Sequence, residues 1–469
     1  MNGGVLSPFS AVSFFATFVL VFVLIFRPQE IWPFLEDFHL LDVLTGLAGL
    51  GVAWDFATEK AKNAYSPQLP FLGAFVASSY FSSAVFLGRE GLSLATTRSA
   101  IATAAMLVVM YGTRTFARLQ ALMALLVVLA VFVAGVAVHQ GHSEPVCIEL
   151  PVSAGESIDT DPGTSDGRNC TTRHDCTENG KTEVDYVCER IGLFKTVSVQ
   201  RRVRWRGQLG DPNEMSVYLG IVIPLLFAMS AGLKKKWATG VALAMLGLIL
   251  YAVILTQSRG GQLVLGAVFA IYFFSRFRWK GLLAAATLAL PVVLLGGRAG
   301  EAADSSTDER LDILYDGVTE FLHRPLFGLG IDQFFEIRRM TAHNSYLLVA
   351  VELGLLGMFA WTGLLWMSVR IPLTVVRDGP PDLNPEVRRL AMALVVSWVG
   401  MAIGIFFLSF TYKQLLFVWL GMSGALYGVV KAEHPSFEVR IERKDILGIA
   451  AFDIVLLVLL FAYTRLKPM

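Results

Sequence analysis

Residues 119–138 read L-Q-A-L-M-A-L-L-V-V-L-A-V-F-V-A-G-V-A-V, an uninterrupted run without a single charged side chain. A helix needs about 17–25 apolar residues to cross the roughly 30 Å hydrocarbon core of a bilayer. Comparable runs recur along the 469-residue chain, which is 55% hydrophobic and only 16% charged. A soluble domain could not hide this much apolar surface from water. The sequence therefore predicts an all-α, polytopic integral membrane protein.

Hydropathy predicts about 12–13 transmembrane helices. The candidate spans are residues 10–26, 40–56, 70–87, 94–112, 119–138, 213–232, 237–256, 260–275, 281–296, 344–369, 390–409, 413–430 and 446–463. Basic side chains cluster in short turns that the span count places on one side, which the positive-inside rule makes cytoplasmic, with the N-terminus. These clusters are Lys60 and Lys62; Arg114 and Arg118; Lys234, Lys235 and Lys236; Arg276, Arg278 and Lys280; Arg377, Arg388 and Arg389; and Arg440, Arg443 and Lys444.

The last predicted span, 446–463, leaves two interpretations open. An odd number of spans places Arg465 and Lys467 outside, against the positive-inside rule. Either the segment is a thirteenth span or it lies along the membrane interface.

Two long segments are predicted to face outward, and they divide the chain into five parts. These are N-terminal transmembrane helices (1–138), a periplasmic cysteine-containing loop (139–205), transmembrane helices with two outer turns (206–296), a second periplasmic loop (297–343) and C-terminal transmembrane helices (344–469). The second loop is predicted to hold an amphipathic helix that ends at Arg324-Pro325. Its apolar face would consist of Leu311, Leu314, Tyr315, Val318, Phe321 and Leu322.

All four cysteines lie in the first outer loop, at Cys147, Cys170, Cys176 and Cys188. An even count confined to one external loop predicts two disulfides in an oxidising compartment, with three possible pairings. The alternative is a zinc site, but close-spaced ligand pairs are lacking and His174 alone is thin support. The disulfide interpretation implies the envelope space outside a bacterial inner membrane, or an equivalent lumen.

Residues 201–207 read R-R-V-R-W-R-G and lie on the predicted outer side, where the positive-inside rule disfavours basic residues. Contact with lipid headgroups or with the loop's own acidic residues would account for Arg201, Arg202 and Arg204 as surface charge. Arg206 differs because Gly207 and Gly210 follow it and would let a ligand approach the backbone.

A second outward arginine, Arg259, lies in Q-S-R-G-G at 257–261, where Gly260 and Gly261 would keep the space around it open. A guanidinium forms two parallel hydrogen bonds to phosphate and stays charged when partly buried. Arg206 and Arg259 therefore suggest a diphosphate held at the outer membrane surface.

His343 opens the stretch H-N-S-Y-L-L-V-A-V-E-L-G-L-L-G, where a polar outer loop becomes a span. A lone histidine at an interface is usually solvated or caps a helix, so position alone is a weak argument for catalysis.

The stretches R-W-R-G-Q-L-G-D-P-N (204–213), T-Q-S-R-G-G (256–261), P-L-F-G-L-G (325–330) and A-H-N-S-Y (342–346) together resemble the O-antigen ligase and polymerase superfamily of bacterial envelope glycosyltransferases. The ligase signature, a histidine, a small polar residue, nine positions and G-x-x-G, matches His343, Asn344, Gly354 and Gly357. The resemblance covers about residues 200–360. The four-cysteine loop is not a general family feature, and a thirteenth span departs from the usual even count.

The resemblance implies a metal-independent, inverting glycosyltransferase without a cofactor. Its partners would be a polyprenyl (undecaprenyl) diphosphate-linked glycan donor, a glycan or lipid A-core acceptor and the bilayer, with no nucleic acid. Arg206 and Arg259 would bind the diphosphate, with Arg206 also catalytic, and His343 would accept or orient the acceptor's proton. Asp211, Asn213 and Asn344 would cap helices and hold these groups in place.

The sequence leaves several alternative functions open. Polymerase and ligase differ only in acceptor, a lipid-linked repeat or the lipid A core, and a protein hydroxyl is a third acceptor. A transporter or flippase of a lipid-linked anionic sugar is the rival from another class. It would need internal repeats and ionisable groups near the middle of the membrane, where these spans carry almost no charge. A catalytically inactive assembly partner is the remaining possibility.

Overall fold

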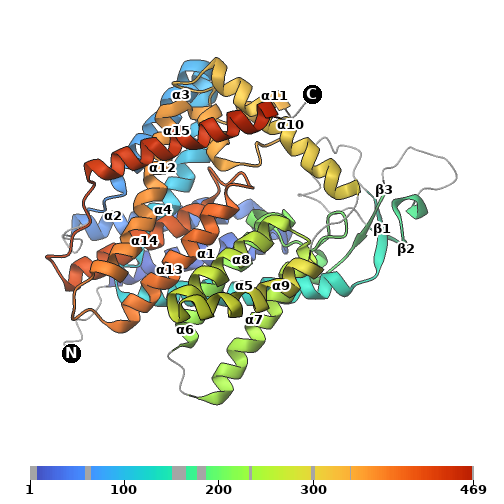
Figure 1. Ribbon diagram of the computed structural model, residues 1–469, viewed down its shortest axis with the longest axis horizontal. Helices are drawn as coiled ribbons and strands as arrows, with labels where there is room; N and C mark the ends of the chain where they lie inside the picture. The colour runs from blue at the N-terminus through green and yellow to red at the C-terminus, as the bar shows by residue number, and fades with distance from the viewer. Residues whose placement is uncertain are drawn as a thin grey trace. The chain divides into compact units, whose positions relative to one another are not determined.

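A computed structural model describes residues 8–58, 65–149, 165–176, 186–231, 235–296, 301–338 and 340–466. Its architecture is α-helical, and Figure 1 labels the elements. The helices are α1 (Pro8–Phe26), α2 (Leu40–Ala57), α3 (Leu69–Ala95), α4 (Ile101–Gly112), α5 (Phe116–His142), α6 (Pro212–Ser230), α7 (Lys236–Thr256), α8 (Arg259–Phe277), α9 (Trp279–Leu295), α10 (Glu301–His323), α11 (Gln333–Arg338), α12 (Ser345–Asp378), α13 (Pro385–Gly404), α14 (Gln414–Glu433) and α15 (Arg443–Leu466).

The prediction of an all-α polytopic membrane protein is confirmed. Every predicted span falls on a helix, and eleven helical stretches of the described residues are long and apolar enough to cross a membrane. One of these stretches, Leu69–Gly112, covers both α3 and α4, whereas α9 is shorter than the rest. The apolar runs therefore located the helices correctly.

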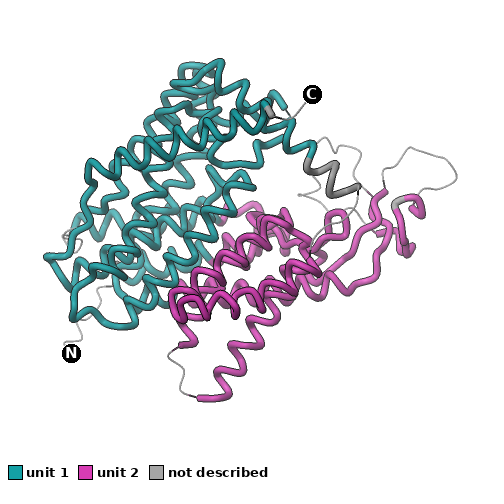
Figure 2. Tube along the Cα trace, viewed as in Figure 1, with its two compact units in different colours: residues 1–21, 41–122, 299–469 teal, residues 22–40, 123–298 magenta. Residues whose placement is uncertain are grey.

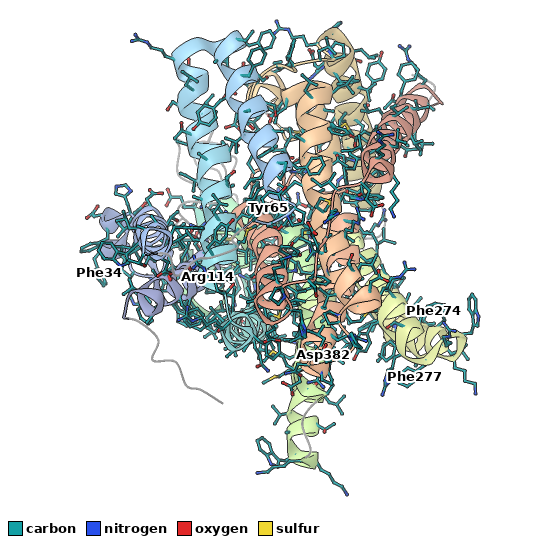
Figure 3. All side chains as sticks on the ribbon, turned by 90° about the vertical axis from the view of Figure 1, so that its left-hand side faces the viewer. Phe34, Tyr65, Arg114, Phe274, Phe277 and Asp382 are labelled. Carbon is teal, nitrogen blue, oxygen red and sulfur yellow. A yellow bond between two sulfur atoms is a disulfide. The ribbon has the colours of Figure 1, made fainter. Side chains whose placement is uncertain are left out.

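The stretch Leu69–Gly112 is a hairpin that reverses at Gly88. Gly88 has φ 60° and ψ −130°, which lies outside the helical region. The hydroxyls of Tyr80 and Thr96 lie 2.9 Å apart, although a straight helix would separate sixteen residues by about 24 Å. Ser99 likewise donates to Ser79 across the two arms, which Figure 3 draws in light blue. The two predicted spans 70–87 and 94–112 are thus distinct arms.

The turn between α8 and α9 has the same local geometry with an arginine in place of glycine. Arg278 has φ 57° and ψ −142°, a left-handed conformation that an L-residue adopts only with strain. Phe274, labelled in Figure 3, packs against Trp279 across the turn. Gly281, three residues after the reversal, lies so close to the α8 backbone that a Cβ would be 2.1 Å from the Phe273 oxygen.

A third reversal divides α12, and here the structure differs from the predicted continuous span 344–369. Gly354 has φ 67° and ψ −170°. The rings of Tyr346 and Trp361 lie 5.3 Å apart, whereas fifteen residues of straight helix would separate them by about 22 Å. Residues 345–353 therefore form a short arm that folds back on the long arm, 355–378. Hydropathy missed this break because both arms are apolar.

The loop 325–330 satisfies the backbone groups that the α12 reversal exposes. Leu329 and Gly330 donate to the carbonyls of Val351 and Glu352 at 2.9 Å each, and Leu355 donates to Pro325 at 2.8 Å. This contact needs small residues on both sides. A Cβ on Gly328 would be 2.3 Å from the Glu352 backbone, and a Cβ on Gly354 would be 2.3 Å from that of Leu326. An apolar interior tolerates a broken helix only with such partners.

The helix α15 packs antiparallel along the long arm of α12. Near its start, Asp445 accepts a hydrogen bond from Trp366 at 3.1 Å, and further along Phe452 contacts Tyr346 at 5.7 Å between ring centroids. Arg443–Arg465 has the length and apolar composition of a membrane span. This packing favours a thirteenth crossing over an interfacial helix.

The predicted amphipathic helix is present as α10, which ends at His323 immediately before Arg324-Pro325. Its buried face includes Val318 and Phe321, as predicted, but Ile313 is buried while Leu322 is 51% exposed. Gly317 lies against Leu347 of the short α12 arm. The helix therefore packs on protein.

The chain forms two compact units, shown in Figure 2: residues 1–21, 41–122 and 299–469 in unit 1, and residues 22–40 and 123–298 in unit 2. In unit 1, α13 and α14 are joined reciprocally, because Trp398 donates to Ser423 and Trp419 donates to Ser397, each at 2.8 Å. In unit 2, the buried Tyr218 of α6 donates to the Leu126 carbonyl of α5 at 2.8 Å. Each pairing uses a polar atom that would be costly to leave unpaired.

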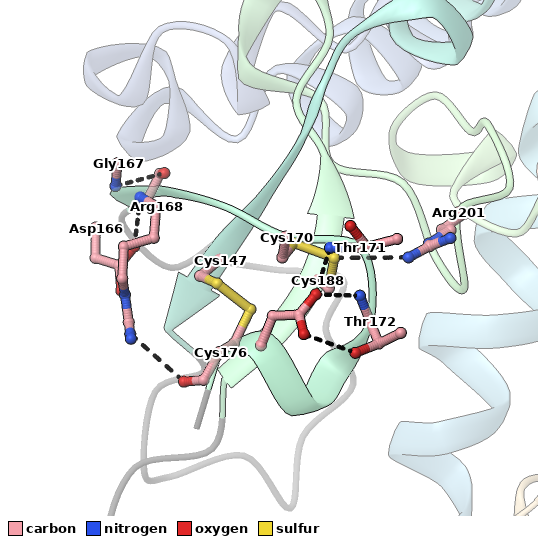
Figure 4. The surroundings of a disulfide bond; sticks show 12 residues. Cys147, Asp166, Gly167, Arg168, Cys170, Thr171, Thr172, Cys176, Cys188 and Arg201 are labelled. Atoms are coloured by element: carbon pink, nitrogen blue, oxygen red, sulfur yellow. Dashed lines mark hydrogen bonds and ion pairs between the residues drawn. A yellow bond between two sulfur atoms is a disulfide. The ribbon is translucent and has the colours of Figure 1, made fainter. Parts of the chain in front are cut away.

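The segment 139–205, which is predicted to face outward, contains a small antiparallel sheet that the sequence did not predict. Its strands are β1 (Pro145–Glu149), β2 (Ser165–Asn169) and β3 (Tyr186–Arg190), in the order β2-β1-β3. Two disulfides, Cys147–Cys176 and Cys170–Cys188, hold the sheet together (Figure 4). The prediction of two disulfides is confirmed, and this pairing is one of the three that were open.

We expect Gly354→Ala to destabilise the fold. The substitution forces an L-residue into a left-handed conformation and a Cβ into the Leu326 backbone, at a cost of about 1–3 kcal/mol for the conformation alone. Thermal unfolding in detergent should show a lower Tm and a smaller monodisperse fraction. The matched control is Gly428→Ala in α14, where a Cβ meets nothing within 4 Å. Equal Tm values for the two variants would contradict the described reversal.

Candidate functional site

An aromatic cluster fixes the arginine segment to the end of α1 and to the middle of α5, in unit 2. The buried Trp205 donates from Nε1 to the Ile25 carbonyl at 2.7 Å, at the end of α1. Its ring lies 6.3 Å from Phe26, 5.3 Å from Phe132 and 6.2 Å from Phe194. Trp205 thereby determines where the residues on either side of it lie.

Arg202 and Arg204 are buried, at 3% and 7% exposure, so their interpretation as surface charge is wrong. Arg202 donates to the Thr256 carbonyl and to Asn213 Oδ1, both at 2.7 Å. Arg204 donates from Nε to the Val197 carbonyl at 2.7 Å. Backbone carbonyls that would otherwise be unpaired explain why these guanidiniums are inside. Arg201 is the exposed member of the cluster.

Arg206 is half-buried and retains unused hydrogen-bonding capacity. Its Nη2 donates to the Phe194 carbonyl at 2.7 Å, while its Nε has no hydrogen-bond partner among the described residues. Burial lowers the pKa of the Arg206 guanidinium, and the nearby Glu30 carboxylate acts in the opposite direction. A guanidinium remains protonated under these conditions, so Arg206 offers a fixed positive charge.

The glycines beside the two arginines are not open space. A Cβ on Gly207 would be 1.9 Å from Arg27 Nε, and a Cβ on Gly261 would be 2.2 Å from Ser216 Oγ. The expectation that these two residues leave room for a ligand is therefore corrected. Gly207 admits another arginine, and Gly261 lets α8 pack tightly on α6.

Two helix N-termini lie side by side in unit 2. Asp211 caps α6 by accepting from Asn213 N at 2.5 Å, and Ser258 caps α8 by accepting from Gly261 N at 3.1 Å. The Ser216–Gly261 contact and the bridge that Arg202 forms between Thr256 and Asn213 hold the two termini together. Exposed Arg259 is the first residue of α8. The positive ends of these two helix dipoles add to the positive potential around Arg259.

The disulfide-bonded sheet supports the arginine segment through Glu189. This carboxylate, 8% exposed, accepts from Ser198 Oγ, from Gln200 N at 2.6 Å and from Arg201 N at 2.8 Å. Glu189 follows Cys188, whose Sγ accepts a hydrogen bond from Arg201 Nη2 at 3.8 Å (Figure 4). The sheet thus fixes the backbone leading into the arginines. The sequence showed Glu189 only as one acidic residue among many.

His343 and Asn344 lie in unit 1, at the start of the short α12 arm. Asn344 is 1% exposed and caps the helix by accepting from Leu347 N at 2.9 Å, as predicted. His343 is half-buried with φ 47°, a strained left-handed conformation. Ser345 fixes the start of this arm by donating to the Ile405 and Leu408 carbonyls.

An apolar cavity of about 550 Å³ in unit 1 lies next to this turn. Tyr346 of the short arm lines it, together with Trp398 and Ile405. The Ile405 carbonyl is the one that holds Ser345. A hydrocarbon chain fits such a lining better than a sugar does.

Sulfur atoms of Cys147, Cys170 and Cys176 lie within 4.8 Å of one another, a spacing that a metal ion could use. Each is bonded to a partner cysteine instead, which removes the thiolate that zinc would need. In the described part of the chain the disulfide interpretation therefore prevails over the zinc alternative.

Residues 244–362 match a family model described as O-antigen ligase. This match covers about a quarter of the chain and includes Arg259, His343 and Asn344, but Arg206, Asp211 and Asn213 precede it. Comparison with curated proteins gave no match. The match supports the predicted resemblance to the O-antigen ligase and polymerase superfamily, and with it a ligase-like role in surface polysaccharide assembly.

We expect Arg204→Ala to destabilise the protein, because it leaves the buried Val197 carbonyl unpaired at a cost of about 1–3 kcal/mol. Arg201→Ala should be nearly neutral, since that side chain is exposed. Thermal unfolding of the two purified variants provides the comparison. A larger loss of stability in Arg201→Ala would contradict the burial described here.

Proposed function

We propose that the protein transfers a glycan from a polyprenyl (undecaprenyl) diphosphate carrier to a hydroxyl acceptor at the periplasmic face of the inner membrane. The acceptor is the lipid A core in a ligase and another lipid-linked repeat in a polymerase. The supporting observation is the pair of arginine-bearing turns at the adjoining N-termini of α6 and α8.

Arg206 and Arg259 would act on the leaving group. As the bond between the sugar's anomeric carbon and the diphosphate oxygen breaks, both electrons remain on that oxygen. Guanidiniums already in place stabilise this growing negative charge without reorganisation, and the helix N-termini add to the effect. Because these groups supply the positive charge, the proposed reaction requires no metal ion.

His343 would act on the acceptor. The acceptor oxygen forms a new bond to the anomeric carbon, from the face opposite the diphosphate, so the configuration inverts. Its proton passes to the His343 imidazole, which acts as the general base. The cap at Asn344 and the bonds of Ser345 hold the histidine's backbone in position.

We expect Arg206→Lys to lower transfer sharply, since lysine keeps the charge but loses the two-pronged guanidinium. Loss of general-base catalysis in His343→Ala should reduce the transfer rate by about 100-fold or more. Donor binding should persist in His343→Ala, because that residue acts on the acceptor. Transfer and donor binding are measured separately on purified protein. Full transfer activity in His343→Ala would contradict the proposed acid–base role of His343. Full transfer activity in Arg206→Lys would contradict the proposed two-pronged contact of the Arg206 guanidinium.

A further inference from the structure

A third arginine lies beside Arg206. Arg27 follows the last residue of α1 and has φ 55°, a strained left-handed conformation, directly before Pro28. Its side chain is 14% exposed and lies over Gly207, where a Cβ would be 1.9 Å from Nε and 2.5 Å from Cζ. The glycine after Arg206 therefore exists to admit the guanidinium of Arg27.

One carboxylate lies among these groups. Glu30 Oε2 accepts from Gly207 N at 3.1 Å, and Glu30 Oε1 is 3.6 Å from Arg27 Nε. Glu30 also acts electrostatically on Arg206. Two guanidiniums and a backbone N–H thus surround a single negative charge, which leaves a net positive charge at this point.

The donors of both arginines are incompletely used. Within the described residues, Nε of Arg27 and Nε of Arg206 are buried and have no hydrogen-bond partner. Buried charged donors without acceptors are costly and rare in folded proteins. A phosphate group offers several acceptor oxygens and matches guanidinium geometry.

We propose that Arg27 and Arg206 together hold one phosphate of the carrier diphosphate. In the ligand-free protein, the Glu30 carboxylate occupies the position of that phosphate. The proposal rests on the proposed function and adds a binding residue to it. When the phosphate arrives, its oxygens take over the contacts to Arg27 Nε, Arg206 Nε and Gly207 N, and the Glu30 carboxylate is displaced.

This arrangement predicts opposite effects for two neighbouring substitutions. Arg27→Gln removes a charged partner of the phosphate. Glu30→Gln keeps an oxygen for Gly207 N but removes the negative charge that competes with the ligand. A purely structural Arg27–Glu30 ion pair would predict that both substitutions weaken the site, so a gain in Glu30→Gln separates the two explanations.

The test measures binding of farnesyl diphosphate to the purified full-length protein in detergent. We expect Arg27→Gln and Arg206→Gln each to weaken binding by about tenfold or more, as loss of a charge-assisted contact does. Glu30→Gln should bind more tightly than wild type. The matched control is Arg168→Gln. Arg168 is a half-buried arginine of β2 that pairs with Asp166 and lies outside the proposed site, so this variant should bind like wild type.

The outcomes separate this inference from the function on which it rests. If Arg27→Gln binds farnesyl diphosphate normally while Arg206→Gln loses binding, the proposed role of Arg27 is wrong. The proposed diphosphate site at Arg206 would then still hold. Weaker binding by Glu30→Gln would contradict the proposal that the Glu30 carboxylate occupies the phosphate position in the ligand-free protein. Failure of the wild-type protein to bind farnesyl diphosphate would overturn the proposed function itself. Equal competition by phosphatidylglycerol would show that the arginines hold a lipid headgroup instead.

Discussion

Backbone groups freed by a broken helix must find partners, and in an apolar interior those partners come from the protein itself. At Gly354 this requirement is met by the loop 325–330, whose amides cover the carbonyls of Val351 and Glu352. The close contact explains the glycines at 328 and 354. It also creates the short helical arm that begins after His343 and Asn344. The histidine is thus held at a fixed helix start instead of on a loose loop.

Unit 2 meets the same requirement with side chains. Arg202 and Arg204 donate to the carbonyls of Thr256 and Val197, and Trp205 donates to that of Ile25. These bonds commit two arginines and the tryptophan to holding the segment in place. Arg206, with a donor unused among the described residues, remains available for a ligand. A cluster of like charges in the sequence therefore separates into arginines that bond to the protein itself and Arg206, which we propose binds a ligand.

Hydropathy predicted the positions of the membrane-spanning helices, because each run of apolar residues is long enough to cross a bilayer as a helix, whereas the short helix α11 was not predicted. The caps at Asp211 and Asn344 followed from residue type alone. The reversal at Gly354 could not be predicted in this way, since apolar residues continue on both sides of it. The burial of Arg202 depends on a partner distant in sequence, because the guanidinium donates to the carbonyl of Thr256, 54 residues further along the chain. Arg27 is marked in the sequence by its position. Like the 201–206 cluster, it is a basic residue on the predicted outer side.

The proposed reaction breaks the bond between sugar and phosphate in a lipid-linked glycan and forms a new bond from the sugar to an acceptor hydroxyl. Its most direct test reconstitutes the purified wild-type protein in liposomes with an undecaprenyl diphosphate-linked repeat, with and without lipid A core, and identifies the carrier product by mass spectrometry. We predict release of intact undecaprenyl diphosphate together with glycan on the acceptor, in the presence of EDTA. Lipid A core as the required acceptor would indicate a ligase, and lengthening of the donor glycan alone would indicate a polymerase. An unchanged carrier with either acceptor, or cleavage between its two phosphates, would contradict the account.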